Sequence, residues 1–362
     1  MKIAVVGGGI FGVTCAWYLA KHGFLVDLFE KAGDLLQAAS GINQYRLHRG
    51  YHYPRSFATA SQSLREFPRF LEHYGSAVFE AEHYYGVAKE GSLSSPEQCR
   101  RAWESCGLDF EEAELSLLNP KTVGWCARVR EALLDPAALR QLGRRYLERW
   151  RVGMRLGREI GFRDLKGYDL IVVAGYVANN AWLESADLPE KEYQFELCEK
   201  PVLALPGRFR NKSVVILDGP FLCIDPVANT DTFVMGNVVH AIHHRNIGLH
   251  PELSPAYAPL LNRGVIAGPP ITRIDDFLAS AAVYFPGIGG AKHLGSMFTV
   301  RAVQPHREHD DARPTIVEEL SDRVVTVFSG KIGTCVAAAE EVLQIAARKR
   351  GIEPWSESAL SG

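Results

Sequence analysis

Three glycines near the start of the chain have the spacing of a dinucleotide-binding turn. Gly7-x-Gly9-x-x-Gly12 follows a β-branched run at residues 2–6 and opens a segment with helical apolar spacing. In such a turn the first glycine allows the tight bend, the second lets the backbone approach a pyrophosphate, and the third lets helix pack on strand. Unpaired N–H groups at the helix start provide the anion site. The alternative is a glycine-rich turn without a ligand.

Glu30 provides the acid that such a site needs. It lies 18 positions after Gly12, at the end of a second apolar run at residues 25–29. Its carboxylate can accept hydrogen bonds from a ribose diol there, and its charge disfavours a 2′-phosphate. We therefore expect FAD or NAD rather than NADP.

Two features favour FAD over NAD. The fingerprint occurs once, at the N-terminus, because the competing Gly287-x-Gly289-Gly290 follows a proline rather than a strand. The second feature is the turn Gly330-Lys331-Ile332-Gly333-Thr334 before the last helical pattern. A helix N-terminus aimed at an isoalloxazine ring would stabilise the negative charge of the reduced flavin. An ordinary N-cap is the alternative for that turn.

A second group of reactive side chains lies in residues 38–55, a stretch rich in Gly, Asn, His and Tyr. An alcohol must lose its O–H proton as hydride leaves its carbon, so a base near neutral pKa is useful. His48 is the best placed candidate base, and Tyr53 could orient the substrate or share the proton. The alternative for His48 is a histidine that only bonds the cofactor or backbone. The same loop holds three arginines, either facing an anionic substrate or solvated: Arg46, Arg49 and Arg55.

Two histidine groups raise the question of a metal site: His240-x-x-His243-His244, and His306-x-x-His309 followed by two aspartates. We expect a strand over residues 231–243, which would turn His240 and His243 to opposite faces. The second group lies in a charged loop. We therefore predict surface histidines and no metal ligands.

Composition bounds the class of protein. The 362 residues include 40 basic and 42 acidic side chains, so the net charge of -2 argues against a nucleic-acid surface. The length predicts two domains. Seven cysteines at irregular spacing form neither a disulfide framework nor a zinc site, which suggests a reducing, cytoplasmic compartment. The uncharged stretch from Ile3 to Ala20 contains Gly7-Gly8-Gly9, so we predict no transmembrane segment.

The patterning predicts an α/β fold: a Rossmann-like FAD-binding domain with an inserted mixed antiparallel-sheet substrate domain. We assign residues 1–75, 125–185 and 295–362 to the first domain, and 76–124 and 186–294 to the second. Helices are expected at 10–22, 57–74, 95–106, 136–150, 253–263, 273–283 and 333–348. Strands are expected at 2–6, 25–29, 168–174, 296–303 and 323–328, with short antiparallel strands over 193–245.

Four features occur in an order that resembles a known family. They are the fingerprint with Glu30, the loop Ala39-Ser40-Gly41-Ile42-Asn43, the strand end Ala174-Gly175 and the closing Ser329-Gly330-Lys331. Together they resemble, over nearly the whole chain, the FAD-dependent oxidoreductases of the D-amino-acid oxidase superfamily. Glycine and sarcosine oxidases, glycerol-3-phosphate dehydrogenase and L-2-hydroxyglutarate dehydrogenase belong to it.

The resemblance implies roles for particular residues. Ser40 and Asn43 would touch the flavin diphosphate or ring. Asn43-x4-His48-x-Gly50-x-x-Tyr53 is similar to a loop that carries a histidine over the flavin in the hydroxyacid branch. Arg301 lies where the amino-acid oxidases hold an arginine for the substrate carboxylate, although Ala302 replaces the usual proline. The alternative for Arg301 is an ion pair with Glu308, Asp310 and Asp311.

The resemblance also bears on how FAD is held. Relatives with covalent flavin use a cysteine near Arg301, and none lies between Cys223 and Cys335, so we expect noncovalent FAD.

These inferences predict an enzyme that takes hydride from a CH–NH or CH–OH group of a small polar substrate, expected to be anionic. Oxygen, a quinone or a carrier protein would reoxidise the flavin, whose ring would lie beneath residues 43–53. Two other classes stay open: a non-redox flavoenzyme such as a sugar mutase, and a flavin-bearing subunit of a complex.

Overall fold

A computed structural model describes residues 1–219, 222–228, 230–307 and 313–352. The chain divides into two compact units. Unit 1 comprises Met1–Leu36, Arg140–Glu192 and Arg313–Gly362, and unit 2 comprises Gln37–Leu139 and Tyr193–Ala312. Compared with the predicted division, residues 37–75, 125–139 and 295–312 group with unit 2, because their strands pair with strands of that unit. Residues 186–192 group with unit 1 instead of the predicted substrate domain.

Helices occur in both units. They are α1 (Ile10–Lys21), α2 (Phe57–Tyr74), α3 (Pro96–Ser105), α4 (Pro136–Arg149), α5 (Asn179–Glu184), α6 (Ile274–Tyr284) and α7 (Cys335–Arg350). None of the helices in the described part of the chain is both long and apolar enough to cross a membrane.

Unit 1 is built on a mostly parallel sheet. Its strands, in spatial order, are β17 (Ile316–Glu319), β18 (Val324–Phe328), β10 (Leu170–Val173), β1 (Lys2–Val6), β2 (Leu25–Glu30) and β9 (Gly153–Leu156). Only β17 pairs antiparallel within this set. The β-branched run of β10 is buried on both faces, as expected for a central parallel strand.

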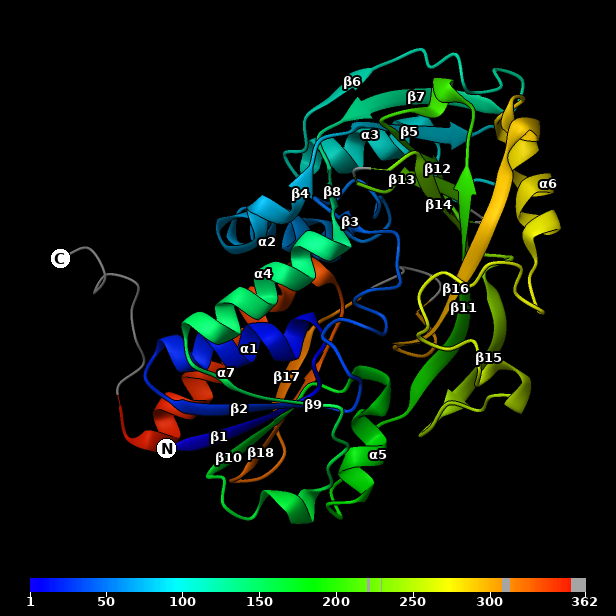
Figure 1. The fold of residues 1–362 in the computed structure, drawn as a ribbon. Coiled ribbons are helices and arrows are strands. Elements are labelled where there is room, and N and C mark those ends of the chain that lie inside the picture. Colours follow the sequence, from blue (N-terminus) through cyan, green and yellow to red (C-terminus); the bar gives the residue numbers. More distant parts are fainter. Residues whose placement is uncertain (220–221, 229, 308–312, 353–362) are drawn as a thin grey trace. The chain divides into compact units, whose positions relative to one another are not determined.

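The helices of unit 1 pack through apolar and aromatic side chains. Figure 1 shows α1 and α7 side by side, in blue and red. Trp17 of α1 stacks on Tyr146 of α4, with ring centroids 4.7 Å apart. The first strand, helix and second strand of the chain form the βαβ unit expected from the sequence, and their carboxyl edge carries the glycine turn and Glu30.

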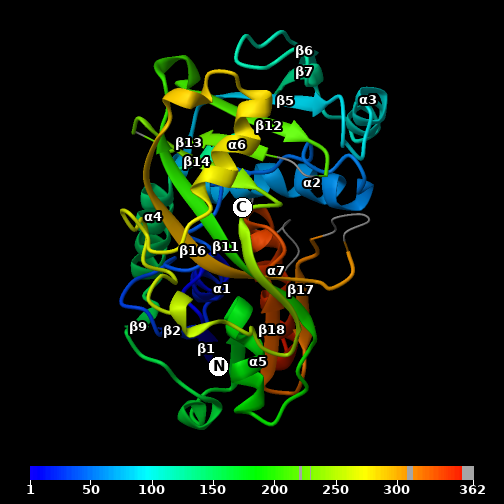
Figure 2. The same ribbon diagram turned by 90° about the vertical axis from the view of Figure 1, so that its right-hand side faces the viewer.

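Unit 2 contains a mixed sheet of nine strands among its described residues. In order they are β15 (Ile242–Gly248), β11 (Tyr193–Ala204), β14 (Thr232–Asn237), β13 (Leu222–Pro226), β12 (Lys212–Leu217), β5 (Glu82–Ala88), β7 (Val123–Val129) and β6 (Phe110–Glu112), with β16 (Lys292–Val303) also paired to β11. Figure 2 shows β11 and β16 as a long curved pair. Phe277 of α6 and Phe285, which directly follows this helix, share a buried apolar cluster with Phe233 and Met235.

A smaller sheet and an aromatic cluster hold the segment that contains His48. The strands β3 (Arg46–Leu47), β8 (Ala132–Leu134) and β4 (Val78–Phe79) pair antiparallel in that order. Trp103 is buried and donates its indole N–H to the Tyr51 carbonyl at 3.0 Å. Its ring also contacts those of Tyr51, Tyr85 and Trp125. Trp103 therefore holds Tyr51 by a hydrogen bond to its backbone and by contact with its ring.

Two expected elements are wrong. Residues 253–263 form no α-helix but a short 3₁₀ turn at Pro255–Tyr257, because prolines at 255 and 259 cannot donate to helical carbonyls and Asn262 has a φ of 58°. The strand expected over 231–243 is two strands, β14 and β15, joined by a turn that contains His240.

Glu199 on β11 anchors the irregular segment that precedes α6. Its buried carboxylate accepts hydrogen bonds from His243 Nε2 at 2.7 Å, Thr272 Oγ1 at 2.5 Å, Ser296 Oγ at 2.6 Å and the Arg273 amide at 2.9 Å. Burial alone would raise the pKa of Glu199, but these four donors outweigh it and lower that pKa.

Replacing Glu199 tests this anchor. Because the folded pKa of Glu199 lies below its unfolded value, its charge stabilises the fold at neutral pH, and that contribution is lost as the pH falls through the folded pKa. Glu199→Gln should lower the free energy of unfolding by about 1–3 kcal/mol at neutral pH. The difference from the wild type, measured by thermal melts, should shrink on acidification below about pH 4.

The exposed Glu252 provides the control, and Glu252→Gln should melt like the wild type at every pH. A Glu199→Gln deficit that stayed constant with pH would show that the carboxylate charge is not its source.

Candidate functional site

In the glycine turn, backbone segments pack so closely that a side chain at Gly7 or Gly12 would clash with a carbonyl group. Gly7 has a φ of 112°, and a Cβ there would lie 2.5 Å from the Ala174 carbonyl oxygen. A Cβ on Gly12 would lie 1.8 Å from the Gly7 carbonyl oxygen. Gly9 is the N-cap of α1 and has extended backbone angles without a side-chain cap. The turn and the following helix therefore have the close packing that the fingerprint predicts.

Glu30 ends β2 beside this turn. Its carboxylate accepts hydrogen bonds from the Gly8 amide at 2.5 Å and from the Ala32 amide at 2.7 Å. A Cβ on Gly8 would lie 2.8 Å from the Glu30 side chain, so only glycine fits there. The structure thus brings Gly7, Gly9, Gly12 and Glu30 together at one edge of the parallel sheet.

The predicted residues at the ends of β10 and β18 also lie in unit 1. Ala174 continues β10 and donates its amide to the Val6 carbonyl at 2.8 Å, and Gly175 follows it. Gly330 donates its amide to Thr315 Oγ1 at 3.0 Å. Lys331 precedes a 3₁₀ turn, Ile332–Thr334, that leads into α7.

Ser40 and Asn43 lie in unit 2, in a tightly bonded bend. The Asn43 amide group donates to the carbonyls of Ala39 at 2.9 Å and Ser40 at 3.1 Å. Its oxygen accepts the Tyr45 amide at 2.6 Å. The side chain of Asn43 therefore shapes the bend that leads to His48. Their predicted contact with the flavin stays a prediction.

His48 lies against a buried carboxylate that sequence reasoning missed. Its Nδ1 is 3.5 Å from Glu131 Oε1, and the side chains are 19% and 0% exposed. The His48 ring meets the Tyr53 ring edge to face, with centroids 5.5 Å apart. Among the described residues, no side chain hydrogen-bonds His48 Nε2. Glu131 carries no sequence signal, because it lies 83 positions away in a turn between two strands.

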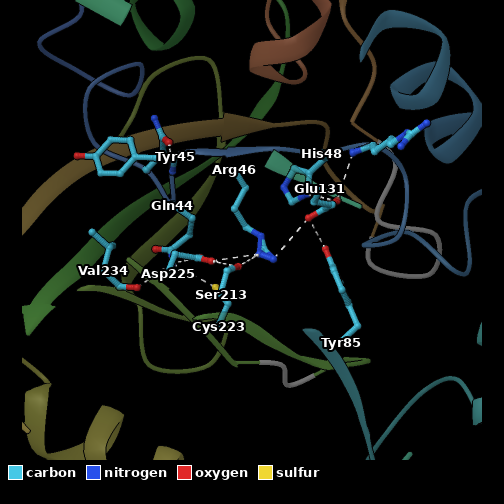
Figure 3. A network of polar contacts seen from close by, with 12 residues as sticks. Gln44, Tyr45, Arg46, His48, Tyr85, Glu131, Ser213, Cys223, Asp225 and Val234 are labelled. Carbon is cyan, nitrogen blue, oxygen red and sulfur yellow. Dashed lines mark hydrogen bonds and ion pairs between the residues drawn. The ribbon is translucent and has the colours of Figure 1, made fainter. Parts of the chain in front are cut away.

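A network around Arg46 holds Glu131 in place (Figure 3). Arg46 Nη2 lies 3.4 Å from Glu131 Oε2, and Arg46 Nη1 lies 3.1 Å from Asp225 Oδ1. Tyr85 donates its hydroxyl to Glu131 Oε2 at 2.8 Å. Asp225 also accepts Ser213 Oγ at 2.7 Å and Gln44 Nε2 at 3.0 Å. All the acidic and basic groups of this network are buried.

The network sets the charge states around His48. Burial alone would raise the pKa of Glu131, but Arg46 and the contact with His48 outweigh it and hold that pKa well below its usual range. Burial, reinforced by the Arg46 guanidinium, lowers the pKa of the neighbouring His83 to about 3. Glu131 is therefore an anion and His83 is neutral near neutral pH. His48 thus faces a fixed negative charge.

The three arginines of residues 46–55 contact different groups. Arg46 belongs to the network, and Arg55 Nε donates to Asp218 Oδ2 at 2.8 Å. Arg49 lies over the Phe67 ring at 5.4 Å.

Arg301 pairs with a carboxylate other than the one considered from sequence. It lies opposite Glu196 in the β11–β16 register, and its Nε donates to Glu196 Oε2. Arg245 Nη2 lies 3.1 Å from the other oxygen of Glu196. Glu308, Asp310 and Asp311 lie outside the described residues. A substrate carboxylate at Arg301 would therefore share this guanidinium with Glu196.

The histidine groups show no common ligand geometry within the described ranges. No group of three or more potential ligands capable of holding a metal ion occurs there. Both ring nitrogens of His243 have partners. Nε2 bonds Glu199, and Nδ1 lies 3.2 Å from the Tyr257 hydroxyl. His309 lies outside the described residues.

The parallel sheet with its glycine turn and Glu30 defines a dinucleotide-binding protein. Comparison with known proteins gives the family: the model described as FAD dependent oxidoreductase matches residues 2–342. The chain belongs to this family of FAD-dependent redox enzymes, as the sequence resemblance predicted.

Individual relatives cover nearly the whole chain. FAD-dependent monooxygenase FPY4 of Fusarium mangiferae is 27% identical over 368 residues, which span 95% of this chain and 90% of that protein. Glycine oxidase from Geobacillus kaustophilus superposes with a TM-score of 0.70 at 16% identity, covering 99% of this chain and 97% of that one. L-proline dehydrogenase from P. horikoshii gives 0.66 at 17% identity, covering 97% and 98%. The solved structures share the fold.

The residues of unit 1 fit the FAD of this family. The glycines leave a backbone cradle that any Cβ would fill, and the Glu30 carboxylate lies next to it. Gly7, Gly9 and Gly12 would hold the diphosphate, and Glu30 would hold the adenosine ribose.

A single methyl group should abolish this fit. Gly12→Ala places a Cβ 1.8 Å from the Gly7 carbonyl oxygen, so the turn must open and lose its anion site. We expect purified Gly12→Ala protein to carry little FAD, measured as the ratio of flavin to protein absorbance, while circular dichroism shows a folded chain.

Gly33→Ala is the matched control, because a Cβ there meets nothing within 4 Å. It should stay as yellow as the wild type. A Gly12→Ala protein with a full complement of FAD would show that this turn does not hold the cofactor.

Proposed function

We propose that the protein removes hydride from a CH–OH or CH–NH group of a small, anionic polar substrate, such as an amino acid, an amine-bearing acid or a 2-hydroxy acid. The FAD of this family supplies the hydride acceptor. The observation that carries the proposal is the pairing of the partly exposed His48 with the buried Glu131.

His48 is proposed as the base. Its Nδ1 faces the Glu131 anion, which favours the tautomer with the proton on Nδ1 and leaves Nε2 to accept a proton. An alcohol releases its O–H proton as hydride leaves the carbon, and Nε2 would take that proton. Glu131 acts through His48: it fixes the ring and stabilises the imidazolium.

Tyr53 and Arg301 complete the proposed substrate site. Tyr53 is buried against the His48 ring, and its proposed role is to orient the substrate or share the proton. Arg301 is proposed to contact a substrate carboxylate with the part of its guanidinium not turned to Glu196.

The cofactor roles beyond the glycine turn follow the sequence resemblance. Ser40, Asn43, Ala174, Gly175, Gly330 and Lys331 are proposed to contact FAD. We propose oxygen or a quinone as the electron acceptor, because the chain holds one dinucleotide fingerprint and no second one for a nicotinamide nucleotide.

A second candidate function is monooxygenation. It is favoured by the relative described as an FAD-dependent monooxygenase, which matches 95% of this chain. The two candidates differ in the product: a monooxygenase places one atom of labelled O₂ in its product, whereas an oxidase releases both as peroxide.

The central test is an anaerobic panel of amino acids, amines and hydroxy acids. A true donor should bleach the visible flavin bands of the purified protein without any added acceptor, and air should restore them. Failure of every donor to bleach the flavin, with bleaching only by dithionite, would favour a non-redox flavoenzyme such as a sugar mutase.

His48→Gln tests the base. We expect it to slow anaerobic flavin reduction by hydroxy acids about a hundredfold to ten-thousandfold, because the O–H proton loses its acceptor. Reduction by amines with a free lone pair should fall much less. Stopped-flow absorbance measures both rates.

Two further variants are compared with His48→Gln. Glu131→Gln should act in the same direction but about 10–100-fold, because the ring remains and only its orienting anion is lost. The exposed His244→Gln is the control and should behave as wild type. Unchanged alcohol oxidation in His48→Gln would remove the base assignment.

A further inference from the structure

One face of β11 carries a row of polar side chains that the proposed reaction does not yet use. Side chains alternate along a strand, so Gln194, Glu196, Cys198 and Lys200 share a face. In the β11–β16 register, Arg301 lies opposite Glu196, and Met297 lies opposite Lys200. The Met297 sulfur lies 3.7 Å from the Tyr45 hydroxyl, within the segment that leads to His48.

The other charged groups near this row have ion-pair partners. Glu196 lies between Arg301 and Arg245. Asp225 and Glu131 both pair with Arg46. Asp225 is further satisfied by Ser213 and Gln44, as Figure 3 shows. None of these carboxylates needs another cation.

Lys200 differs from them. Within the described parts of the chain its ammonium makes no ion pair and no hydrogen bond. Its side chain is partly buried near the Cys198 and Cys223 thiols, the Arg301 cation and the Asp225 anion. Burial lowers the pKa of Lys200, and the Arg301 cation adds to this effect while the Asp225 anion opposes it. A partly desolvated ammonium without a partner is unfavourable, and a bound anion would offset that cost.

The charged side chains around this row of β11 do not balance one another. The group contains three carboxylates (Glu131, Glu196, Asp225) and four cations (Arg46, Arg245, Arg301, Lys200). One positive charge is left over, and Lys200 is the member of this group without a counterion among the described residues. A single excess charge matches a carboxylate better than a phosphate dianion.

We propose that Lys200 binds the carboxylate of the substrate and selects for monoanionic acids. This inference rests on the proposed function and deepens it. Arg301 then has a supporting part, because its Nε is held by Glu196. The carboxylate accepts hydrogen bonds from the ammonium and replaces the missing counterion on the β11 face.

Anion binding can be measured without turnover. Acetate is titrated into the FAD-loaded protein, and the shift of the visible flavin bands and of the melting temperature is followed. Lys200→Gln should weaken acetate binding about tenfold or more, whereas Lys200→Arg should keep most of it. Lys212→Gln is the control: this lysine of the same unit lies 3.9 Å from Glu82 and should not affect acetate.

Each result of the acetate titration either supports or overturns the proposed anion site. Equal acetate affinity in the wild type and Lys200→Gln, or no acetate binding by the wild type, would overturn the proposal, even if donors still bleach the flavin. Tighter binding of inorganic phosphate than of acetate would overturn the selection for a carboxylate. If acetate binding depends on Lys200 but no donor bleaches the flavin, the anion site is supported. The proposed oxidation is then wrong.

Discussion

The buried guanidinium of Arg46 is the constraint on which the proposed substrate chemistry depends. Its side chain is 2% exposed, so its charge must be balanced inside unit 2. Asp225 on β13 and Glu131 before β8 provide that balance, and Ser213 on β12 completes it. Satisfying one cation therefore ties three strands to β3. It also leaves the second oxygen of Glu131 facing His48, so the orientation of the proposed base follows from the electrostatics of the core.

The two units use different chemistry for recognition. Unit 1 offers mainly backbone: the glycine turn, the start of α1 and a carboxylate that already accepts backbone amides. Such a site suits a diphosphate and a ribose. Unit 2 offers charged side chains on a sheet and in the segment before it. Substitution of the turn glycines meets backbone atoms, whereas charged side chains on a sheet face are not confined to one residue type by such clashes.

Charge balance also distinguishes the cations on β11 and β16. Arg301 was the expected carboxylate ligand, yet Glu196 faces it directly in the strand register. Lys200, two alternations further along the same face, has no counterion among the described residues. An arginine held by a carboxylate positions its neighbours, whereas a partly buried cation without one attracts an anion. In the proposed carboxylate site, selectivity would follow from the cation that has no counterion among the described residues.

What the sequence by itself determined is local. The spacing of Gly7, Gly9 and Gly12 and the position of Glu30 identify the turn, because each requirement concerns residues close in the chain or at the ends of adjacent strands. Helical periodicity located α2 over its observed range, 57–74, but failed over 253–263, where prolines and a positive φ at Asn262 interrupt the backbone. Tertiary structure alone decided the partners: Glu131 for His48, Glu196 for Arg301 and, within the described part of the chain, none for Lys200. These pairs join residues 83 and 105 positions apart, so they depend on strand register and tertiary folding. The energy of a buried charge is set only when the folded chain surrounds it.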